Sequence, residues 1–306
     1  MTPRVLITGG TGFLGLPCAR RLVELGMEVH VTARHRSDEL PIGAKFYPID
    51  MLKADVELIP RLISYIRPTH LLHLAWIATP SAYWDSPLNS DWLRASVHTL
   101  MSFGLQGGLR VVAAGTCAEY DWSRSGVYRE NAKLAPTATA YSHAKNSLRY
   151  FAEVWGEKGN HSVAWARLFF LYGPREHPAR LVPSVATALL AGRPAETTAG
   201  TQERDFLHVE DAADALVRLL LSDVTGPVNI GSGEPVALRT VAETLAHIVG
   251  RPDLLRLGVK LTSANEPPQL VADVGRLRSE VGWSPRIELR QGLAETVAWW
   301  RSRDAA

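Results

Sequence analysis

The chain has 306 residues, with 33 basic and 31 acidic side chains and an apolar fraction of 46%. A net charge of +2 excludes a strong electrostatic preference for nucleic acid or an anionic membrane, and the apolar fraction is that of a globular protein. No run of about 18 apolar residues is present, so we expect neither a transmembrane helix nor a signal peptide. Two cysteines are too few for a disulfide framework, which favours a reducing, cytoplasmic location.

The N-terminal stretch predicts a strand, a tight turn and a helix. A short apolar run begins at Val5, a glycine-rich turn follows, and helical spacing continues from Leu16 to Val23. The glycines fit the pattern G-x-x-G-x-x-G at Gly9, Gly12 and Gly15. Such a turn lets the backbone approach a pyrophosphate, which then lies at the positive end of the helix. We therefore predict dinucleotide binding, with an ordinary tight loop as the alternative.

Strands and helices then alternate along the chain. The predicted strands are Met27–Ala33, Lys45–Ile49, Leu71–Ala75, Leu109–Ala114 and Val163–Leu171. The predicted helices are Glu57–Ile66, Asn89–Phe103 and Ala138–Trp155. Because these strands are continuous apolar runs, they indicate a parallel sheet that is covered on both faces. We predict an α/β fold with a doubly wound, parallel-sheet Rossmann domain over residues 1–172 and a return segment near 205–230.

The pattern changes after Tyr172, where prolines become frequent. Helical spacing recurs at Val209–Leu221, Leu238–Val249 and Leu289–Arg301, and a short strand is predicted at Val228–Ile230. We predict that residues 173–306 form a smaller, mixed, substrate-binding lobe. This lobe is expected to close over the carboxyl ends of the strands, where open α/β sheets bind ligands.

The end of the second strand predicts the type of dinucleotide. An acidic residue there would bind the ribose 2′-hydroxyl of NAD, but the chain has Arg34 and Arg36, with no carboxylate before Asp38. Two arginines can pair with a 2′-phosphate, so we predict NADP(H), with NAD(H) less favoured. Two solvated loop arginines are the alternative. Asp50, just past the third strand, is placed to reach an adenine edge or to form a surface turn.

Three side chains indicate proton transfer at a carbonyl oxygen. Tyr141 and Lys145 lie one helical turn apart on the same face. A lysine ammonium beside a phenol favours the phenolate and brings its pKa toward the working range. Thr116 ends a buried strand, where its hydroxyl would share the substrate oxygen with Tyr141. A strand-end hydrogen bond to the backbone is the alternative for Thr116.

Other residues near these positions are open to two interpretations. Glu119 is either an additional acid or base or a solvated loop carboxylate, and we favour the solvated carboxylate. Cys117 is expected to be a packed thiol rather than a nucleophile, because no activating histidine is evident nearby. Trp76 and its aromatic neighbours are expected either to line a sugar or base pocket or to pack against one another in a loop. His70 and His73 are predicted to face opposite sides of a strand, so no metal site is expected.

Taken together, these motifs resemble the extended short-chain dehydrogenase/reductases that act on nucleotide-linked sugars, a family of NAD-dependent epimerase/dehydratase type. The resemblance covers nearly the whole chain and includes the glycine motif, Thr116 and the Tyr141/Lys145 helix. It continues through the segments Arg167–Pro174, Arg204–Asp211 and Glu280–Pro285.

The resemblance implies a catalytic triad of Thr116, Tyr141 and Lys145. It implies that Arg204 holds the nucleotide diphosphate of the sugar. From their positions, we also expect Trp76 and Cys117 to lie beside the substrate. It also implies a homodimer that pairs the helices Asn89–Phe103 and Ala138–Trp155. The expected cofactor-binding residues are Gly9, Gly12, Phe13, Leu14, Gly15, Arg34, Arg36, Asp50, Met51, Leu74, Ala75, Tyr141 and Lys145.

Departures from the family pattern narrow the chemistry. Dehydratases of the family carry Asp-Glu directly after the catalytic threonine, where this chain has Cys117 and Ala118. The segment that begins at Glu266 lacks an arginine often found there, and Phe170 replaces a frequent asparagine. The first expectation is therefore an NADPH-dependent reductase of a nucleotide-linked 4-keto-6-deoxy sugar. The alternatives are an epimerase with tightly bound cofactor and a regulator that binds NADP(H) without turnover.

Overall fold

The computed structural model describes residues 3–53, 55, 57–80, 82–135, 139–263 and 266–304. Its α-helices are α1 (Gly15–Glu24), α2 (Leu58–Ile66), α3 (Leu88–Leu105), α4 (Ala140–Gly159), α5 (Leu181–Leu190), α6 (Val209–Leu220), α7 (Leu238–Val249), α8 (Gly275–Ser279) and α9 (Leu289–Asp304). The predicted helix Ala138–Trp155 begins outside the described residues, because Ala138 is not among them. In the described ranges, no helix is both long and apolar enough to cross a membrane.

The main sheet has seven parallel strands in the order β11-β7-β5-β4-β1-β2-β3. Their bounds are β1 (Arg4–Thr8), β2 (Glu28–Ala33), β3 (Lys45–Pro48), β4 (His70–His73), β5 (Arg110–Thr116), β7 (Ser162–Leu168) and β11 (Gly226–Ile230). The order reverses between β1 and β4, which is where open α/β sheets bind ligands. The predicted α/β fold with a doubly wound parallel sheet is confirmed.

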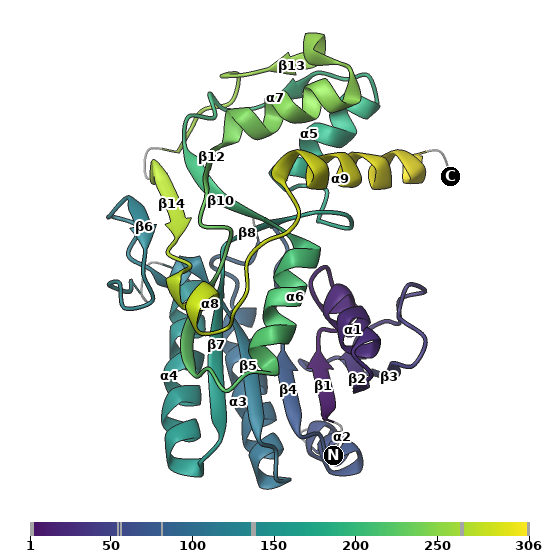
Figure 1. Ribbon diagram of the computed structural model, residues 1–306, viewed down its shortest axis with the longest axis vertical. Coiled ribbons are helices and arrows are strands. Elements are labelled where there is room, and N and C mark those ends of the chain that lie inside the picture. The colour runs from purple at the N-terminus through teal and green to yellow at the C-terminus, as the bar shows by residue number, and fades with distance from the viewer. Residues whose placement is uncertain are drawn as a thin grey trace.

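Both faces of this sheet are buried, which explains the continuous apolar runs in its strands. Val5 and Ile7 pack with α1 and α6 in one core, whereas Leu6 packs with α2, α3 and α4 in the other. Figure 1 shows α1 and α6 in front of the sheet and α3 behind it. The alternation along β1 therefore divides adjacent side chains between two separate cores.

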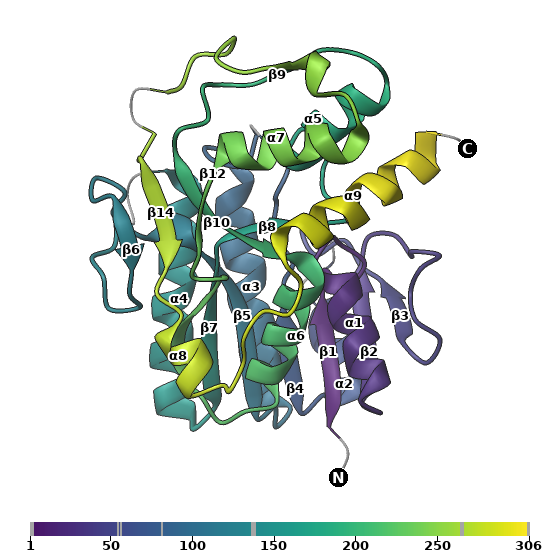
Figure 2. The same cartoon turned by 45° about the horizontal axis from the view of Figure 1, so that its top comes forward.

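A second part of the molecule lies beyond the carboxyl ends of these strands (Figures 1 and 2). It contains a third core between α5, α7 and α9, built from residues such as Val185, Leu245 and Val297. A mixed sheet of β12-β10-β14-β6, with β8 beside β10, joins the two parts. Its strands are β6 (Gly126–Tyr128), β8 (Phe170–Tyr172), β10 (Glu203–His208), β12 (Pro235–Ala237) and β14 (Gln269–Ala272), and a separate pair consists of β9 (Ala195–Glu196) and β13 (Leu255–Arg256).

The predicted strand Val163–Leu171 is wrong as a single element. Leu168 pairs with Ile230 in the main sheet, whereas Phe170 pairs with Phe206 in the mixed sheet. The apolar run is continuous because both halves are buried, but they have different pairing partners. β7 therefore ends at Leu168, and β8 begins two residues later.

Candidate active site

The glycine turn between β1 and α1 has the geometry of a phosphate cradle. Gly9 has φ of 70°, and a Cβ added at Gly15 would lie 2.2 Å from the Gly9 carbonyl oxygen. Side chains are therefore excluded at these two positions. The helix begins without a side-chain cap at Leu14, and the amides of Phe13 and Leu14 have no hydrogen-bond partner among the described residues. Unpaired amides at a helix N-terminus fit the pyrophosphate of a dinucleotide.

The ends of neighbouring strands surround this turn. The amides of Leu74 and Ala75, which follow β4, donate to the backbone oxygen and hydroxyl of Thr8 at 3.2 and 3.3 Å. Past β3, Asp50 is half-buried and its Oδ1 accepts the Leu52 amide at 3.1 Å. The adjacent Met51 is buried. The predicted cofactor-binding residues on β1, β3 and β4 therefore lie around one edge of the sheet.

Arg34 and Arg36 follow β2 at the same edge. Both are exposed, and neither forms an ion pair within the described ranges. The loop that carries them is fixed beside the glycine turn, because the Thr11 hydroxyl donates to the His35 carbonyl at 3.0 Å. Two uncompensated guanidinium groups beside the turn fit an additional phosphate on the cofactor.

Thr116 is held by a capping box at the end of β5. Its hydroxyl accepts the Ala118 amide at 3.2 Å, and its own amide donates to Glu119 Oε1 at 2.9 Å. The 3-10 helix η1 (Cys117–Glu119) begins at this point. This capping box fixes Thr116, because Ala118 binds its side chain while Glu119 binds its backbone amide.

Tyr141 and Lys145 reach the same place from α4. A capping box between Thr139 and Ser142 starts this helix, and the Tyr141 amide donates to the Trp84 carbonyl at 2.9 Å. The Lys145 ammonium donates to the Ala114 carbonyl on β5 at 2.9 Å and lies 6.0 Å from the Tyr141 ring centre. The structure therefore brings the phenol, the ammonium and the strand-end threonine together.

Burial shifts both titratable groups of this cluster. It raises the pKa of the Tyr141 phenol above its usual range, and the side-chain hydrogen bond with Thr116 opposes that shift. It lowers the pKa of the Lys145 ammonium to about 7, and the charge of Glu119 opposes that shift. The phenol is consequently protonated near neutral pH and can donate a proton.

Cys117 is a packed thiol, in agreement with the preferred interpretation. It is buried, burial raises its pKa to about 12, and its carbonyl accepts the Trp122 indole N–H at 2.9 Å. Ala118 is also buried. The two positions that follow Thr116 therefore supply neither a carboxylate nor a thiolate to the chemistry.

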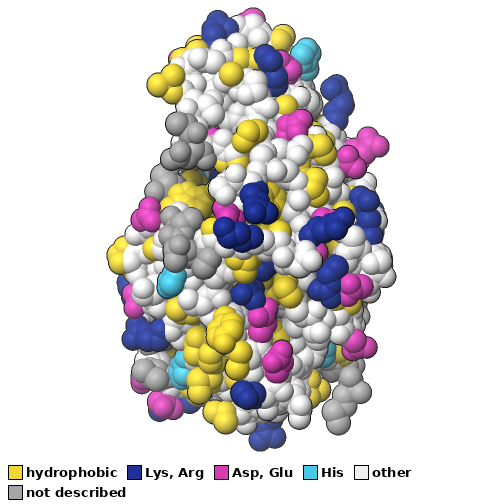
Figure 3. Space-filling model, turned by 90° about the vertical axis from the view of Figure 1, so that its left-hand side faces the viewer, with side chains coloured by type: hydrophobic (Ala, Val, Ile, Leu, Met, Phe, Trp, Pro, Cys, Tyr) yellow, Lys and Arg dark blue, Asp and Glu magenta, His cyan; other side chains and the backbone are white. Residues whose placement is uncertain are grey.

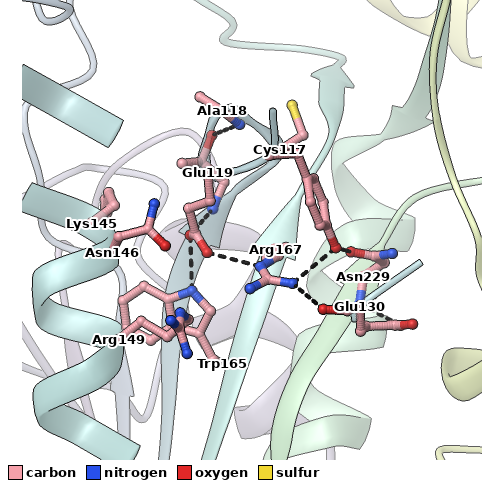
Figure 4. A network of polar contacts seen from close by, with 12 residues as sticks. Cys117, Ala118, Glu119, Glu130, Lys145, Asn146, Arg149, Trp165, Arg167 and Asn229 are labelled. Atoms are coloured by element: carbon pink, nitrogen blue, oxygen red, sulfur yellow. Dashed lines mark hydrogen bonds and ion pairs between the residues drawn. The ribbon is translucent and has the colours of Figure 1, made fainter. Parts of the chain in front are cut away.

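The prediction of a solvated Glu119 is wrong. Its side chain is fully buried, and its Oε2 accepts the Arg167 Nε at 2.8 Å (Figure 4). Its Oε1 accepts the Trp165 indole N–H at 2.8 Å as well as the Thr116 amide. Arg167 also donates to the Glu130 carbonyl at 2.8 Å. A buried charge must be paired and hydrogen-bonded, so this carboxylate supports Thr116 and is not a free acid or base.

Arg204 lies on β10 with its side chain almost fully buried. It donates to the Glu203 carbonyl at 2.7 Å and forms an ion pair with Glu266, which is partly exposed. Its charge lies close enough to Cys117 to affect that thiol. Arg204 therefore approaches the site from the second part of the molecule, but a carboxylate already pairs with it. This partner could not be predicted from the sequence, because Glu266 lies 62 residues from Arg204.

Asp205, the next residue, is a buried clamp. Its Oδ1 accepts the amide and hydroxyl of Ser232 at 2.6 and 2.7 Å, and its Oδ2 accepts the amides of Gly233 and Ala272 at 2.9 and 3.0 Å. Four donors on one carboxylate tie β10 to β14 and to the turn after β11. The backbone at Arg204 is therefore fixed.

Two further charged residues near the site were missed. The Arg180 guanidinium lies 5.6 Å from the Tyr83 ring centre, and Tyr83 packs edge-on against Tyr141 at 4.8 Å. Burial raises the pKa of the nearby Glu176 to about 8, and the charge of Arg180 opposes the shift. Their signal was weak, because both lie in a proline-rich loop without periodicity. In the residues that the structure describes, no group of three or more side chains could hold a metal ion.

Comparisons with known proteins agree with this geometry. The model of the "NAD dependent epimerase/dehydratase family" matches residues 5–231. A UDP-glucuronic acid decarboxylase of Arabidopsis thaliana is 27% identical over 95% of this chain and 86% of its own length. A UDP-glucose 4-epimerase of Azospirillum brasilense is 29% identical over 98% and 92%.

Solved structures show the same fold over the whole chain. A UDP-glucose 4-epimerase of Thermus thermophilus, solved with NAD, has a TM-score of 0.87 at 25% identity and covers 97% of this chain and 99% of its own. The NAD-dependent NDP-hexosamine 5,6-dehydratase TunA has a TM-score of 0.86 at 29% identity and covers 99% of both chains.

Proposed function

This chain belongs to the NAD dependent epimerase/dehydratase family and is an enzyme of the extended short-chain dehydrogenase/reductase type, and from that premise we propose that it is an NADPH-dependent reductase of a nucleotide-linked 4-keto-6-deoxy sugar. The observation that carries the proposal is the meeting of Thr116, Tyr141 and Lys145 at the edge of the sheet that also carries the glycine turn. No carboxylate or thiolate follows Thr116 to support another chemistry.

When bound, the nicotinamide cofactor would supply a hydride for reduction of the keto carbon. Tyr141 donates its phenolic proton to the oxygen of that carbon, and Thr116 donates a hydrogen bond to the same oxygen. Lys145 stabilises the phenolate that remains and holds the ribose hydroxyls of the cofactor. The protonated state of Tyr141 near neutral pH suits this direction, because the reaction begins with proton donation.

Water elimination and decarboxylation receive less support from the site. Water elimination needs a base for the C–H proton and an acid for the leaving hydroxyl, and decarboxylation of a keto acid needs an acid to protonate the enolate that is left. Cys117 and Ala118 cannot act in that way, and Glu119 is fully committed to Arg167, Trp165 and the Thr116 amide. Hydride transfer coupled to proton transfer through Tyr141 is the chemistry that these residues support.

Arg34 and Arg36 support the choice of NADPH, although the solved relatives named above are described with NAD or as NAD-dependent. Hydrogen bonds to charged groups contribute about 1.5–3 kcal/mol each, so the R34A/R36A double variant should bind NADPH at least about tenfold more weakly. Its affinity for NADH should stay unchanged, as measured by isothermal titration calorimetry. Equal losses for both cofactors would contradict the assignment of NADPH.

The activity is tested with a panel of 4-keto-6-deoxy sugar nucleotides while the absorbance of NADPH is followed. Tyr141→Phe should lower kcat by about 10²- to 10⁴-fold, the usual contribution of a general acid. Tyr65→Phe is the matched control, because Tyr65 is an exposed tyrosine on α2 away from the site. Failure of every keto sugar to oxidise NADPH would refute the reductase.

An epimerase is the second candidate, since the 29% identical relative from Azospirillum brasilense carries that name. An epimerase regenerates its cofactor, so the purified protein should retain stoichiometric cofactor and interconvert two sugar nucleotides without added reductant. Nuclear magnetic resonance of the sugar products distinguishes the two reactions. Cofactor binding that Tyr141→Phe leaves unchanged, in a protein without any turnover, would instead indicate a regulator.

A homodimer through α3 and α4 is also part of the proposal. These helices pack together, and the exposed face of α4 has a hollow lined by Tyr150, Phe151, Val154, Trp155, Lys158 and Gly159. Figure 3 shows hydrophobic side chains gathered on the face of the molecule that carries α4. Exposed apolar patches of this kind mark protein contacts. Tyr150→Glu should convert the dimer to a monomer in sedimentation analysis, and a monomeric wild type would refute it.

A further inference from the structure

The ring of Trp76 packs against Lys145, a residue of the candidate active site. The Lys145 Nζ lies 3.8 Å from the centre of the Trp76 ring, and Lys145 is only 3% exposed. Of the three N–H donors of the ammonium, one goes to the Ala114 carbonyl. No acidic side chain forms an ion pair with Lys145 in the described ranges. The indole face therefore provides the other favourable surface for this buried cation.

The indole is itself fixed by a buried amide. Its Nε1 donates to Asn89 Oδ1 at 2.9 Å, and Asn89 is 1% exposed. The amide nitrogen of Asn89 donates to the Tyr83 and Ser86 carbonyls at 2.7 and 3.0 Å. Trp92 stacks on Trp76 with ring centres 6.3 Å apart. A planar ring with one hydrogen bond and one stacked neighbour has little freedom to rotate.

We propose that Trp76, oriented by Asn89, is a positioning residue for Lys145. The ring face attracts the ammonium, while the indole N–H fixes where that face lies. A carboxylate in this place would hold the ammonium more strongly and compete with the cofactor for its donors. An aromatic face leaves the remaining N–H donors available to the ribose hydroxyls. This role differs from the predicted one, in which Trp76 lines the substrate.

Asn89 links the supports of both catalytic groups. Its oxygen fixes Trp76, which contacts Lys145, and its nitrogen fixes the backbone of Tyr83, whose ring packs against Tyr141. The titratable groups that face Lys145 are Tyr141 on its own helix, Glu119 on η1 and His73 on β4. The inference rests on the proposed function only in assigning a catalytic role to Lys145.

The test compares Trp76→Leu with Trp76→Phe by magnetic resonance titration of labelled lysine, in the presence and absence of NADPH. The chain has six lysines, so the Lys145 signal can be assigned with Lys145→Arg. In the wild type, burial holds the Lys145 pKa near 7. Trp76→Leu removes the ring face that favours the ammonium, so it should lower that pKa further and weaken NADPH binding roughly tenfold. Trp76→Phe retains an aromatic face and should show a smaller change in both quantities.

Trp283→Phe is the matched control. It removes an equivalent indole N–H bond, to Asp214 Oδ2 at 3.0 Å, in a different core. A merely structural role for Trp76 predicts that both tryptophan variants lower the melting temperature without moving the Lys145 titration. A wild-type titration and NADPH affinity in Trp76→Leu would overturn the proposal. Because neither measurement needs a sugar, the result does not depend on whether the proposed reductase activity is found.

Discussion

Two arginine–glutamate pairs border the candidate active site, and they differ in almost every physical respect. Arg167 and Glu119 lie beneath Thr116 with side chains 1% and 0% exposed, and four further polar groups bind them. Arg204 is 3% exposed, but its partner Glu266 is 36% exposed and comes from a loop. The chemistry of the two pairs is the same. Burial of the carboxylate makes the first pair a fixed support, whereas the carboxylate of the second pair can turn to solvent.

The largest expected effect comes from breaking the buried pair, Arg167 and Glu119. Arg167→Met leaves Glu119 charged in the core without its partner, which should cost about 3–5 kcal/mol of unfolding free energy. Arg204→Met is the comparison, because Glu266 can turn to solvent and the loss should be about 1 kcal/mol or less. Urea unfolding measures both. Equal losses would show that the pairs do not differ as their burial indicates.

Low pH should lower the stability of the folded protein through His73. This side chain is buried between the hydroxyls of Thr8 and Ser96, each 2.8 Å from a ring nitrogen, and burial lowers its pKa to about 3. The unfolded chain takes up a proton near pH ~6.5 and the folded protein does not. Stability is therefore lost as pH falls from that value, by about 2 kcal/mol at pH ~5.

The check is urea unfolding across this pH range in the wild type and in His73→Gln. The variant should be less stable at neutral pH, because it loses hydrogen bonds, but its stability should depend less on pH. An unchanged slope would mean that other histidines cause the acid sensitivity.

The smallest expected effect concerns the partly exposed pair, Arg204 and Glu266. Glu266→Gln removes the carboxylate that pairs with Arg204. On the expectation that Arg204 holds the diphosphate of the sugar nucleotide, the Kd of UDP-glucose or dTDP-glucose should fall severalfold. The unfolding free energy should change by less than about 1 kcal/mol, as for other partly exposed pairs. Calorimetric titration gives the affinity, and Glu234→Gln, on the turn after β11, serves as the control. Weaker binding by Glu266→Gln would mean that Glu266 itself contacts the ligand.

Local sequence patterns predicted much of the fold, because they depend on neighbours along the chain. Strand β5 and helices α3 and α4 follow from apolar runs and helical spacing, and their predicted bounds differ by only a few residues. The break at Phe169 could not be predicted, since it depends on Ile230 and Phe206, which lie far along the chain.

The site shows the same division between local and distant causes. Tyr141 and Lys145 share a helix face, so their spacing was enough to pair them. Glu119 was misinterpreted because its partner Arg167 is 48 residues away. The sequence did contain a signal for this pair, because Arg167 lies inside an apolar strand and Glu119 lies among apolar residues. Opposite charges in two apolar surroundings predict a buried pair, which is a stronger indication than either charge alone.

Asp205 has a consequence for how quickly a ligand can enter. Its carboxylate accepts four hydrogen bonds and fixes the strand that carries Arg204. The backbone of β10 therefore stays in place, and Glu266 is the partner of Arg204 that is exposed enough to move. Rotation of a partly exposed side chain takes picoseconds to nanoseconds, far less than the microseconds to milliseconds of a domain closure. On the expectation that Arg204 holds a diphosphate, release of the Glu266 side chain should not be the step that limits its binding.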